Sequence, residues 1–361
     1  MRALRGRLVP MHATQKAMAR RLGVSASLVS RALRGQAERI GAHPATIQRI
    51  RAEAARCGYA PNVAALSLRG GATRMLGVVV RDFADPFFGP IVGALQRLAA
   101  AEGYALVMTG GGAGSRGGAE LLPLHRYRLD GFILVGSDFQ PHGIDPVLRG
   151  GAPVVRLGDG PADDEAVQVC VAQAAGFDQL LGHLRALGHR HIGYLGDTTP
   201  TNARREAVLR QALRAAGLPV RPAWFVRVPD MASGTLARTL PRLWTGGCAP
   251  APTAVVAADD VMALALLRAL HEAGARVPHD LSVTGVDDIP FAHLAVPALT
   301  TLRSPIAAMA ERAFQLASGR EPVSGVQRRF EVQPELVVRE SCGPAPGPGP
   351  RIPRTTEGVL R

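Results

Sequence analysis

Cysteine is scarce in this chain, and its few copies are widely spaced. The 361 residues include four cysteines, Cys57, Cys170, Cys248 and Cys342, and no two of them form a CxxC pair. This spacing argues against a disulfide framework and against a structural zinc site. A chain long enough to bury a core without disulfides is typical of the reducing cytoplasm, and we expect that location.

Long apolar stretches are also lacking. No segment approaches the ~20 apolar residues that a membrane-spanning helix needs. The opening segment Met1–Arg7 is basic, but no apolar core follows it, so we expect no secretory signal peptide. Met1 and Met11 are both candidates for the first residue of the protein.

Arrangements typical of catalytic sites are missing as well. No Ser/His/Asp set, paired-acid arrangement or metal-spaced His/Cys cluster stands out. His189 and His191 precede a predicted strand, and we expect them to be structural. The segment 112–117 fits the dinucleotide-binding pattern GxGxxG, but it follows the second strand of its domain and not the first, which weakens the match. The sequence therefore predicts no enzyme, no cofactor and no metal.

Positive charge, by contrast, is concentrated at one end. Residues 1–74 contain fourteen Arg or Lys and two acids, a net charge of +12, whereas the other 287 residues contribute only +1 to the total of +13. A basic module joined to a nearly neutral body is typical of a protein that binds a polyanion, most often nucleic acid.

The basic module has the pattern of a small helical domain. Apolar residues recur at helical spacing from Thr14 to Leu33, and a third helix is predicted at about Pro44 to Cys57, ended by Gly58. The helix–Gly–helix spacing sets a second helix, about Ser25 to Leu33, steeply across the first, so that it can enter the DNA major groove. The alternative is an ordinary three-helix packing domain with a solvated cationic face.

The second helix offers candidate DNA contacts. Its first turn presents Ala26 and Ser27 to base edges, and Arg31, one turn further on, can donate two hydrogen bonds to guanine O6 and N7. Other side chains are placed for phosphates, which position a helix without reading sequence. These are Lys16, the N-cap residue Ser25, Ser30 and Arg34.

The segment after this domain is expected to fold only on contact. Pro61–Arg69 is long enough for two helical turns, too few for a stable isolated helix. In a dimer, two copies can pack together and wedge Leu68 between base pairs in the minor groove. The alternative is a plain linker with Leu68 buried against the body.

From Met75 onward, short apolar runs alternate with amphipathic helices. This alternation predicts parallel sheets covered on both faces, and eight runs over roughly 260 residues exceed one sheet, so we infer two similar lobes. The Gly/Pro-rich stretch after Cys342 cannot pack a core and is predicted to be a disordered tail. The runs are Leu76–Val80, Ala105–Met108, Phe132–Val135, Val154–Leu157, Ile192–Leu195, Phe225–Val228, Ala254–Ala257 and Leu281–Val286.

Candidate ligand contacts follow several of these runs. Open α/β sheets bind ligands at the carboxyl ends of their strands, where this chain carries Phe87, Phe88, Arg205, Asp259 and Asp287. Carboxylates accept from hydroxyl groups, the guanidinium donates to oxygens and the aromatic rings cover an apolar face, so the set suits a sugar. The alternative for each of the two acids is a helix N-cap, which does not exclude a ligand contact.

The chain resembles the lactose/galactose repressor family of bacterial transcription regulators. The likeness spans roughly residues 13–341, and its motifs stand in the family's order. They include Ala13–Leu33, Gly58–Asn62, Met75–Val80, Asp85–Phe88, Leu129–Leu134, Leu187–Gly193, Asp259–Ala263, Val277–Ile289 and Pro334–Ser341.

The resemblance implies a helix-turn-helix DNA-binding domain (13–59), a hinge helix (60–71) and a two-lobed core like that of periplasmic binding proteins. The N-lobe would comprise 75–172 and 301–331, the C-lobe 173–300 and 332–341, and the disordered tail 342–361.

By the same resemblance, Phe87, Arg205, Asp259 and Asp287 match the family's effector-contact positions. The chain departs from the family at Ala172-Gln173, where Asp-Asn is usual.

Together these features predict a cytoplasmic, sequence-specific transcriptional regulator of the repressor type. It would bind a palindromic operator in double-stranded DNA as a homodimer, under the control of a small effector, a sugar or derivative, held between the lobes. The alternative is a stand-alone sugar receptor or an NAD-dependent enzyme with a non-functional basic arm.

Overall fold

The structure is a computed structural model in which residues 14–33, 37–59, 72–110, 124, 127–137, 150–159, 166–229, 235–236, 250–321 and 328–347 are described. The chain divides into two units, a headpiece of Met1–Thr73 and a body of Arg74–Arg361. In the part of the chain that is described, no helix is both long and apolar enough to span a membrane.

The headpiece is built from three α-helices, as the sequence predicts. They are α1 (Gln15–Leu22), α2 (Ala26–Leu33) and α3 (Pro44–Arg56), and the short 3-10 helix η1 (Glu38–Ile40) precedes α3. Thr14 caps α1 by accepting from the Ala17 amide, and Gly23 ends it in the left-handed conformation, with φ of 66°. The buried side chains form one small core, Met18, Ala19, Val29, Ala32, Ala37, Ile47, Ile50 and Ala54.

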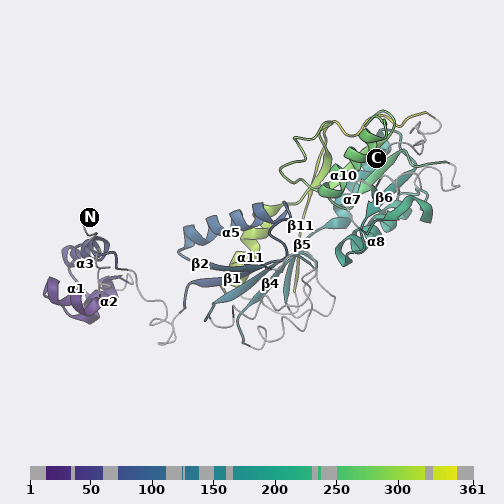
Figure 1. The fold of residues 1–361 in the computed structure, drawn as a ribbon. Coiled ribbons are helices and arrows are strands. Elements are labelled where there is room, and N and C mark those ends of the chain that lie inside the picture. The colour runs from purple at the N-terminus through teal and green to yellow at the C-terminus, as the bar shows by residue number, and fades with distance from the viewer. Residues whose placement is uncertain are drawn as a thin grey trace, which may run out of the picture. The chain divides into compact units, whose positions relative to one another are not determined.

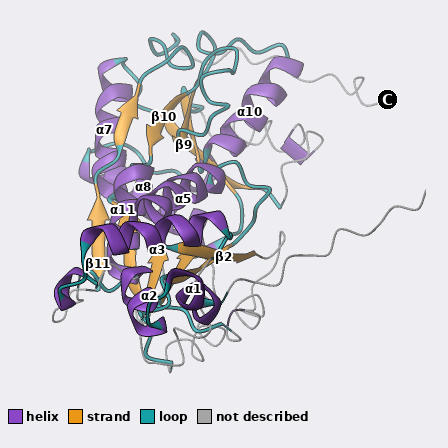
Figure 2. Cartoon of the chain, turned by 90° about the vertical axis from the view of Figure 1, so that its left-hand side faces the viewer, coloured by secondary structure: helices purple, strands orange, loops and turns teal. Residues whose placement is uncertain are grey.

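The N-lobe of the body contains a six-stranded parallel sheet (Figure 1). Its strand order is β11-β5-β4-β3-β1-β2. The strands are β1 (Met75–Val80), β2 (Ala105–Gly110), β3 (Gly131–Val135), β4 (Val154–Leu157), β5 (Val167–Val171) and β11 (Arg329–Val332). Helices α5 (Phe88–Glu102) and α11 (Ile306–Ala317) pack side by side on one face of this sheet (Figure 2). The apolar strands are buried by this cover, as expected for a parallel sheet.

The C-lobe repeats the arrangement with another six strands in the order β12-β10-β9-β8-β6-β7. The strands are β6 (Ile192–Gly196), β7 (Phe225–Arg227), β8 (Ala254–Ala257), β9 (Ser282–Asp287), β10 (Thr300–Arg303) and β12 (Glu335–Val337), and only β12 is antiparallel to its neighbour. Its α-helices of more than two residues, among those described, are α7 (Gln173–Ala186), α8 (Pro200–Ala215) and α10 (Asp260–Glu272). Two similar lobes with parallel sheets confirm the predicted fold class.

One expected lobe boundary differs from the structure. The sequence analysis assigned 301–331 to the N-lobe, but Thr301–Arg303 belong to β10, which pairs with β9 of the C-lobe. The chain therefore leaves the C-lobe at Ser304 and Pro305, before α11. The pairing with β9 satisfies the backbone groups of these residues, which decides their lobe.

The expectation of a disordered tail from Cys342 is wrong for its first six residues. The Gly343 amide donates to Ser282 Oγ at 3.1 Å, and the Gly343 carbonyl lies 3.0 Å from Nε2 of His189. The Ala345 amide donates to the Leu187 carbonyl. Backbone hydrogen bonds thus hold the segment 342–347 on the C-lobe although its composition cannot form a core of its own.

Candidate functional site

A cavity of about 480 Å³ lies between the two lobes. Its lining comes from segments that follow β1, β3 and β4 in the N-lobe and β6, β8 and β9 in the C-lobe. In each sheet the strand order reverses direction at this point, since β1 lies between β2 and β3, and β6 between β7 and β8. The cavity therefore occupies the place where open α/β sheets bind ligands.

The structure brings all five predicted ligand residues to this cavity, which is lined by Phe87, Phe88, Arg205, Asp259 and Asp287. The rings of Phe87 and Phe88 meet edge to face with centroids 5.4 Å apart. Phe88 is only 3% exposed and belongs to the N-lobe core, so Phe87 is the ring that can offer its surface to a ligand.

Arg205 and Asp287 are paired with each other. Arg205 Nη2 lies 2.8 Å from Asp287 Oδ1, and Nη1 lies 3.3 Å from Oδ2 and 2.7 Å from the Ala258 carbonyl. Burial by itself lowers the pKa of Arg205, but the carboxylates of Asp287 and Asp259 outweigh it and raise the pKa above its usual value. Arg205 Nε is buried and has no hydrogen-bond partner.

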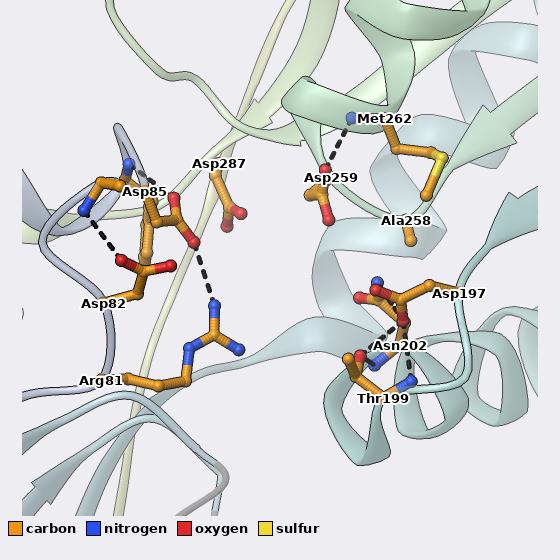
Figure 3. Close-up of polar contacts among 12 residues, drawn as sticks. Arg81, Asp82, Asp85, Asp197, Thr199, Asn202, Ala258, Asp259, Met262 and Asp287 are labelled. Carbon is orange, nitrogen blue, oxygen red and sulfur yellow. Dashed lines mark hydrogen bonds and ion pairs between the residues drawn. The ribbon is translucent and has the colours of Figure 1, made fainter. Parts of the chain in front are cut away.

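Asp259 is the N-cap of α10, as the alternative interpretation suggested. Its Oδ1 accepts from the Met262 amide at 2.8 Å (Figure 3). Burial raises the pKa of this carboxyl, although the Met262 hydrogen bond and Arg205 act in the opposite direction. Capping uses one carboxylate oxygen, so the same residue can also accept from a ligand.

The acid next in sequence, Asp260, has a structural role. It is fully buried, its Oδ1 accepts from Thr301 Oγ1 at 2.5 Å, and its Oδ2 accepts from the Ile289 amide at 2.8 Å. Burial raises the pKa of Asp260 to about 8, and the nearby Asp287 adds to the effect. Gly285 leaves room for it, because an added Cβ there would lie 2.1 Å from Asp260 Oδ1.

Sequence reasoning missed a polar cluster at the end of β6. Asp197 Oδ1 accepts from the Thr199 amide at 2.8 Å, from Thr199 Oγ1 at 2.6 Å and from Asn202 Nδ2 at 2.9 Å (Figure 3). All three residues line the cavity. A signal was present, since Asp197 lies two residues after Leu195 just as Asp259 lies two residues after Ala257, and Leu195 and Ala257 are register partners.

A second missed contact lies on the N-lobe side. Arg81 Nη2 lies 2.9 Å from Asp85 Oδ2, and its guanidinium stands 5.0 Å from the centroid of the Phe88 ring. Asp85 Oδ1 accepts from the Phe87 amide at the start of α5. Burial raises the pKa of Asp85, against the opposing effects of the Phe87 hydrogen bond and Arg81.

Asp159, which follows β4, connects the two lobes at one side of the cavity. Its Oδ2 accepts from Gln173 Nε2 at 2.7 Å, and its backbone carbonyl accepts from Arg204 Nη2 at 3.2 Å, both from the C-lobe. Its Oδ1 accepts from Arg329 of β11 at 2.7 Å. This Asp159 cluster was also missed, because it joins four distant parts of the chain.

In the headpiece, the three predicted base-reading residues Ala26, Ser27 and Arg31 are exposed on α2. Val29 and Ala32 of α2 are buried, so the opposite face of α2 is exposed to solvent. The hydroxyl of Ser25 accepts from the Leu28 amide at 3.1 Å and caps the helix.

The predicted phosphate contacts Lys16 and Ser25 are exposed and Ser30 is half-buried, whereas Arg34 and Leu68 lie outside the described residues. Glu53 is bound by Arg21 and Arg56 at 3.2 and 2.7 Å, so one of the few headpiece acids is already neutralised.

Comparisons with known proteins agree with this architecture. Residues 181–342 match the family of periplasmic binding protein-like domains. The chain is 28% identical to the HTH-type transcriptional repressor PurR of Photobacterium profundum, over 91% of this chain and 98% of that protein. It is also 28% identical to the HTH-type transcriptional regulator DegA of Bacillus subtilis, over 91% and 97%.

Solved structures extend the likeness to the whole fold. The Lac repressor dimer bound to operator and the anti-inducer ONPF matches with a TM-score of 0.74 and 25% identity, over 92% of this chain and 100% of that one. A LacI family transcriptional regulator from Mycobacterium smegmatis matches with a TM-score of 0.64 and 28% identity, over 74% and 99%. The chain is similar over most of its length to transcriptional regulators of the LacI family. The resemblance seen in the sequence is thereby confirmed.

Two other sequence features of this protein bear on its chemistry. The GxGxxG segment at 112–117 lies outside the described residues. His189 is fully buried, with Nδ1 2.9 Å from Thr253 Oγ1 and Nε2 bonded to Gly343, and burial lowers its pKa. It therefore fastens the segment after β12 to the C-lobe, which is a structural task. Among the described residues, no group of three or more His, Cys, Asp or Glu side chains is placed to hold a metal ion.

Proposed function

We propose that this LacI-family protein represses transcription by binding a palindromic operator as a homodimer, and that a small polyhydroxyl effector, a sugar or sugar derivative, controls it. The observation that carries the proposal is the joining of a cationic headpiece, whose α2 is exposed along one face, to a body with a polar cavity between two lobes. The first part suits DNA and the second a metabolite.

In this proposal α2 lies in the major groove. Ala26 and Ser27, in its first turn, contact base edges, and Arg31 donates to guanine. Lys16, Ser25, Ser30 and Arg34 contact phosphates and fix the register. The hinge helix at 60–71 forms on the operator and inserts Leu68 into the minor groove.

The effector contacts are proposed for Phe87, Arg205, Asp259 and Asp287, with Phe88 supporting the first ring. Carboxylate acceptors, a buried guanidinium and one aromatic face form a set that suits a hydroxylated ring. The transcriptional regulator CelR, solved as a complex with cellobiose, supports a sugar, since it is 27% identical over 91% of this chain with a TM-score of 0.62.

Dimerisation is proposed through the body, where large apolar side chains are unusually exposed. Phe291, Leu294 and Val296, between β9 and β10, are 54%, 66% and 95% exposed. Clustered apolar exposure of this kind marks an interaction surface, and a second copy gives the two headpieces that a palindrome requires. The protein acts in the cytoplasm, needs no cofactor and carries out no catalytic step.

Effector binding acts by shifting an equilibrium between two arrangements of the lobes. A ligand can shift it only by the difference between its affinities for the two arrangements. Contacts from both lobes to one cavity supply such a difference, because they form together only when the lobes are correctly spaced.

The test is fluorescence anisotropy of the full-length protein with duplex DNA from upstream of its own gene. We expect tight binding whose logarithm falls steeply and linearly with the logarithm of salt concentration. A random duplex of equal length is the control, and equal affinity for both duplexes contradicts the proposal. Removal of residues 1–70 tests the alternative, since a sugar receptor or NAD-dependent enzyme keeps its full role without them, whereas a repressor does not.

A further inference from the structure

The cavity between the lobes has an excess of acidic side chains. Of the residues that the structure describes, seven aspartates line it, against two arginines. Three of the aspartates are held by arginines inside the protein: Asp85 by Arg81, Asp287 by Arg205 and Asp159 by Arg329. Asp260 is fully buried beneath Thr301 and faces no solvent. The aspartates that are neither paired with an arginine nor fully buried determine which ligand charge the cavity favours.

Two of the remaining acids, Asp197 and Asp259, stand side by side. The strands β6 and β8 are paired in parallel with Leu195 opposite Ala257, and Asp197 and Asp259 each lie two residues after these partners. Figure 3 shows both residues bordering the same space, on either side of Ala258. Within the described part of the chain, neither forms an ion pair with a cationic side chain.

Toward the residues that the structure describes, each of these carboxylates uses only one oxygen. Oδ1 of Asp259 caps α10, and Oδ1 of Asp197 binds Thr199 and Asn202 at the start of α8. The second oxygen of each is left as an acceptor. The N-terminus of α10, which would otherwise attract an anion, is thus occupied by Asp259, and that of α8 is capped by Thr199, whose hydroxyl donates to Asp197. A phosphate or carboxylate on the ligand would be repelled here.

Arg205 supplies an independent sign of a ligand. The residue is only 9% exposed and lines the cavity, and its terminal nitrogens are taken up by Asp287 and Ala258. Its Nε has no hydrogen-bond partner among the described residues. A buried donor without an acceptor is costly, so the ligand should bring an oxygen to this position.

We propose that the effector is a hydroxylated compound carrying a protonated amine, which binds between the carboxylates of Asp197 and Asp259, while one of its oxygens accepts from Arg205 Nε. This inference rests on the proposed function, since it assigns the ligand class of the same cavity. Burial already penalises the charge on Asp259 and raises its pKa, and a bound cation removes that penalty. A neutral sugar meets the needs of Arg205 but brings no positive charge to the two carboxylates.

The test is isothermal titration of the full-length protein with matched hexose sets in the gluco, galacto and manno series. Each set contains the neutral hexose, its 2-amino form and its uronic acid, at about pH 6.5, where the amine is protonated. We expect one amino form to bind at least about tenfold more tightly than its neutral counterpart, with no binding of the uronic acids.

The variants Asp197→Asn and Asp259→Asn keep the oxygen that accepts the internal hydrogen bonds and remove the charge. We expect each to reduce the preference for the amino form over its neutral counterpart to about threefold or less. Glu272→Gln is the matched control, because it removes a carboxylate from the exposed end of α10, outside the cavity. It should leave the preference intact.

The inference is overturned if a neutral or acidic form binds as tightly as the amino form, or if no amino form binds in any series. The outcome for the proposed function is distinguishable from the outcome for this inference. If an amino form binds but leaves operator affinity unchanged, the regulatory function is wrong and the ligand class stands. If a neutral hexose alone changes operator affinity, the function stands and the ligand class is wrong.

Discussion

The carboxylate of Asp159 in the N-lobe lies 2.7 Å from the side-chain nitrogen of Gln173, at the first residue of the C-lobe helix α7. Asp159 is 8% exposed, and its other carboxylate oxygen is held by Arg329. The hydrogen bond therefore spans the point where the chain first passes from one lobe to the other. Together with the bond that Arg204 donates to the Asp159 backbone carbonyl, it makes this residue a direct contact between the lobes.

Replacement of Asp159 by Ala should change the response to the effector more than the stability. The variant loses the carboxylate that accepts from Gln173 and Arg329. The arrangement of the lobes that these hydrogen bonds hold therefore becomes less stable relative to the second arrangement of the lobes. We expect the effector concentration for half-maximal change in operator binding to shift about fivefold or more, as measured by anisotropy. Glu331→Gln is the control, since Glu331 also binds Arg329 but makes no hydrogen bond to the C-lobe. Equal shifts in both variants would refute an interlobe role.

Asp287→Asn should destabilise the body strongly. The change removes the charge that compensates the buried Arg205, while Asn tolerates the positive φ of 109° at this position. Loss of one partner of a buried ion pair costs about 3 kcal/mol or more, measured as the free energy of unfolding in urea. Asp280→Asn, which breaks the pair with the exposed Arg276, should cost much less. Similar losses in the two variants would show that Arg205 is compensated by other groups.

The stability of the body should fall as the pH rises towards 8. Asp260 has a pKa of about 8 in the folded protein and an ordinary value of 3.8, so the folded state keeps a proton that the unfolded chain loses. The stabilisation is complete below about pH 4 and is lost by about pH 8, with a slope of at most about 1.4 kcal/mol per pH unit. Asp260→Asn should remove this part of the slope in urea unfolding measured between those pH values. An unchanged slope would mean that Asp260 is ionised in the folded state.

Arg31→Ala should relax the sequence preference of the headpiece. Loss of two hydrogen bonds to a guanine reduces operator affinity by about 10- to 100-fold, with little effect on a random duplex. Lys16→Ala is the matched change, since a lost phosphate contact weakens both duplexes alike and reduces the salt slope by about one. Anisotropy with both duplexes distinguishes the two patterns. If Arg31→Ala also weakens both duplexes equally, Arg31 contacts phosphate and not a base.

Local features of the molecule were predictable because their causes lie close together in the chain. The headpiece helices follow from apolar spacing, from the caps Thr14 and Ser25, and from Gly23 in the left-handed conformation. The parallel sheets follow from apolar runs alternating with helices. Asp259 combines both kinds of signal. It precedes a helix, where an N-cap residue is expected, and it follows a strand, at the edge of the sheet where ligands bind.

Tertiary structure alone decided which side chains meet. Arg205 and Asp287 are 82 residues apart and Asp159 and Arg329 are 170 apart, and no local pattern specifies such partners. The same holds for the segment 342–347, whose composition predicts disorder but whose backbone finds acceptors and donors on the C-lobe. Hydrogen-bond partners depend on where the rest of the chain has been placed by packing. The class of protein could therefore be predicted from the sequence, whereas the charge balance of its cavity required the fold.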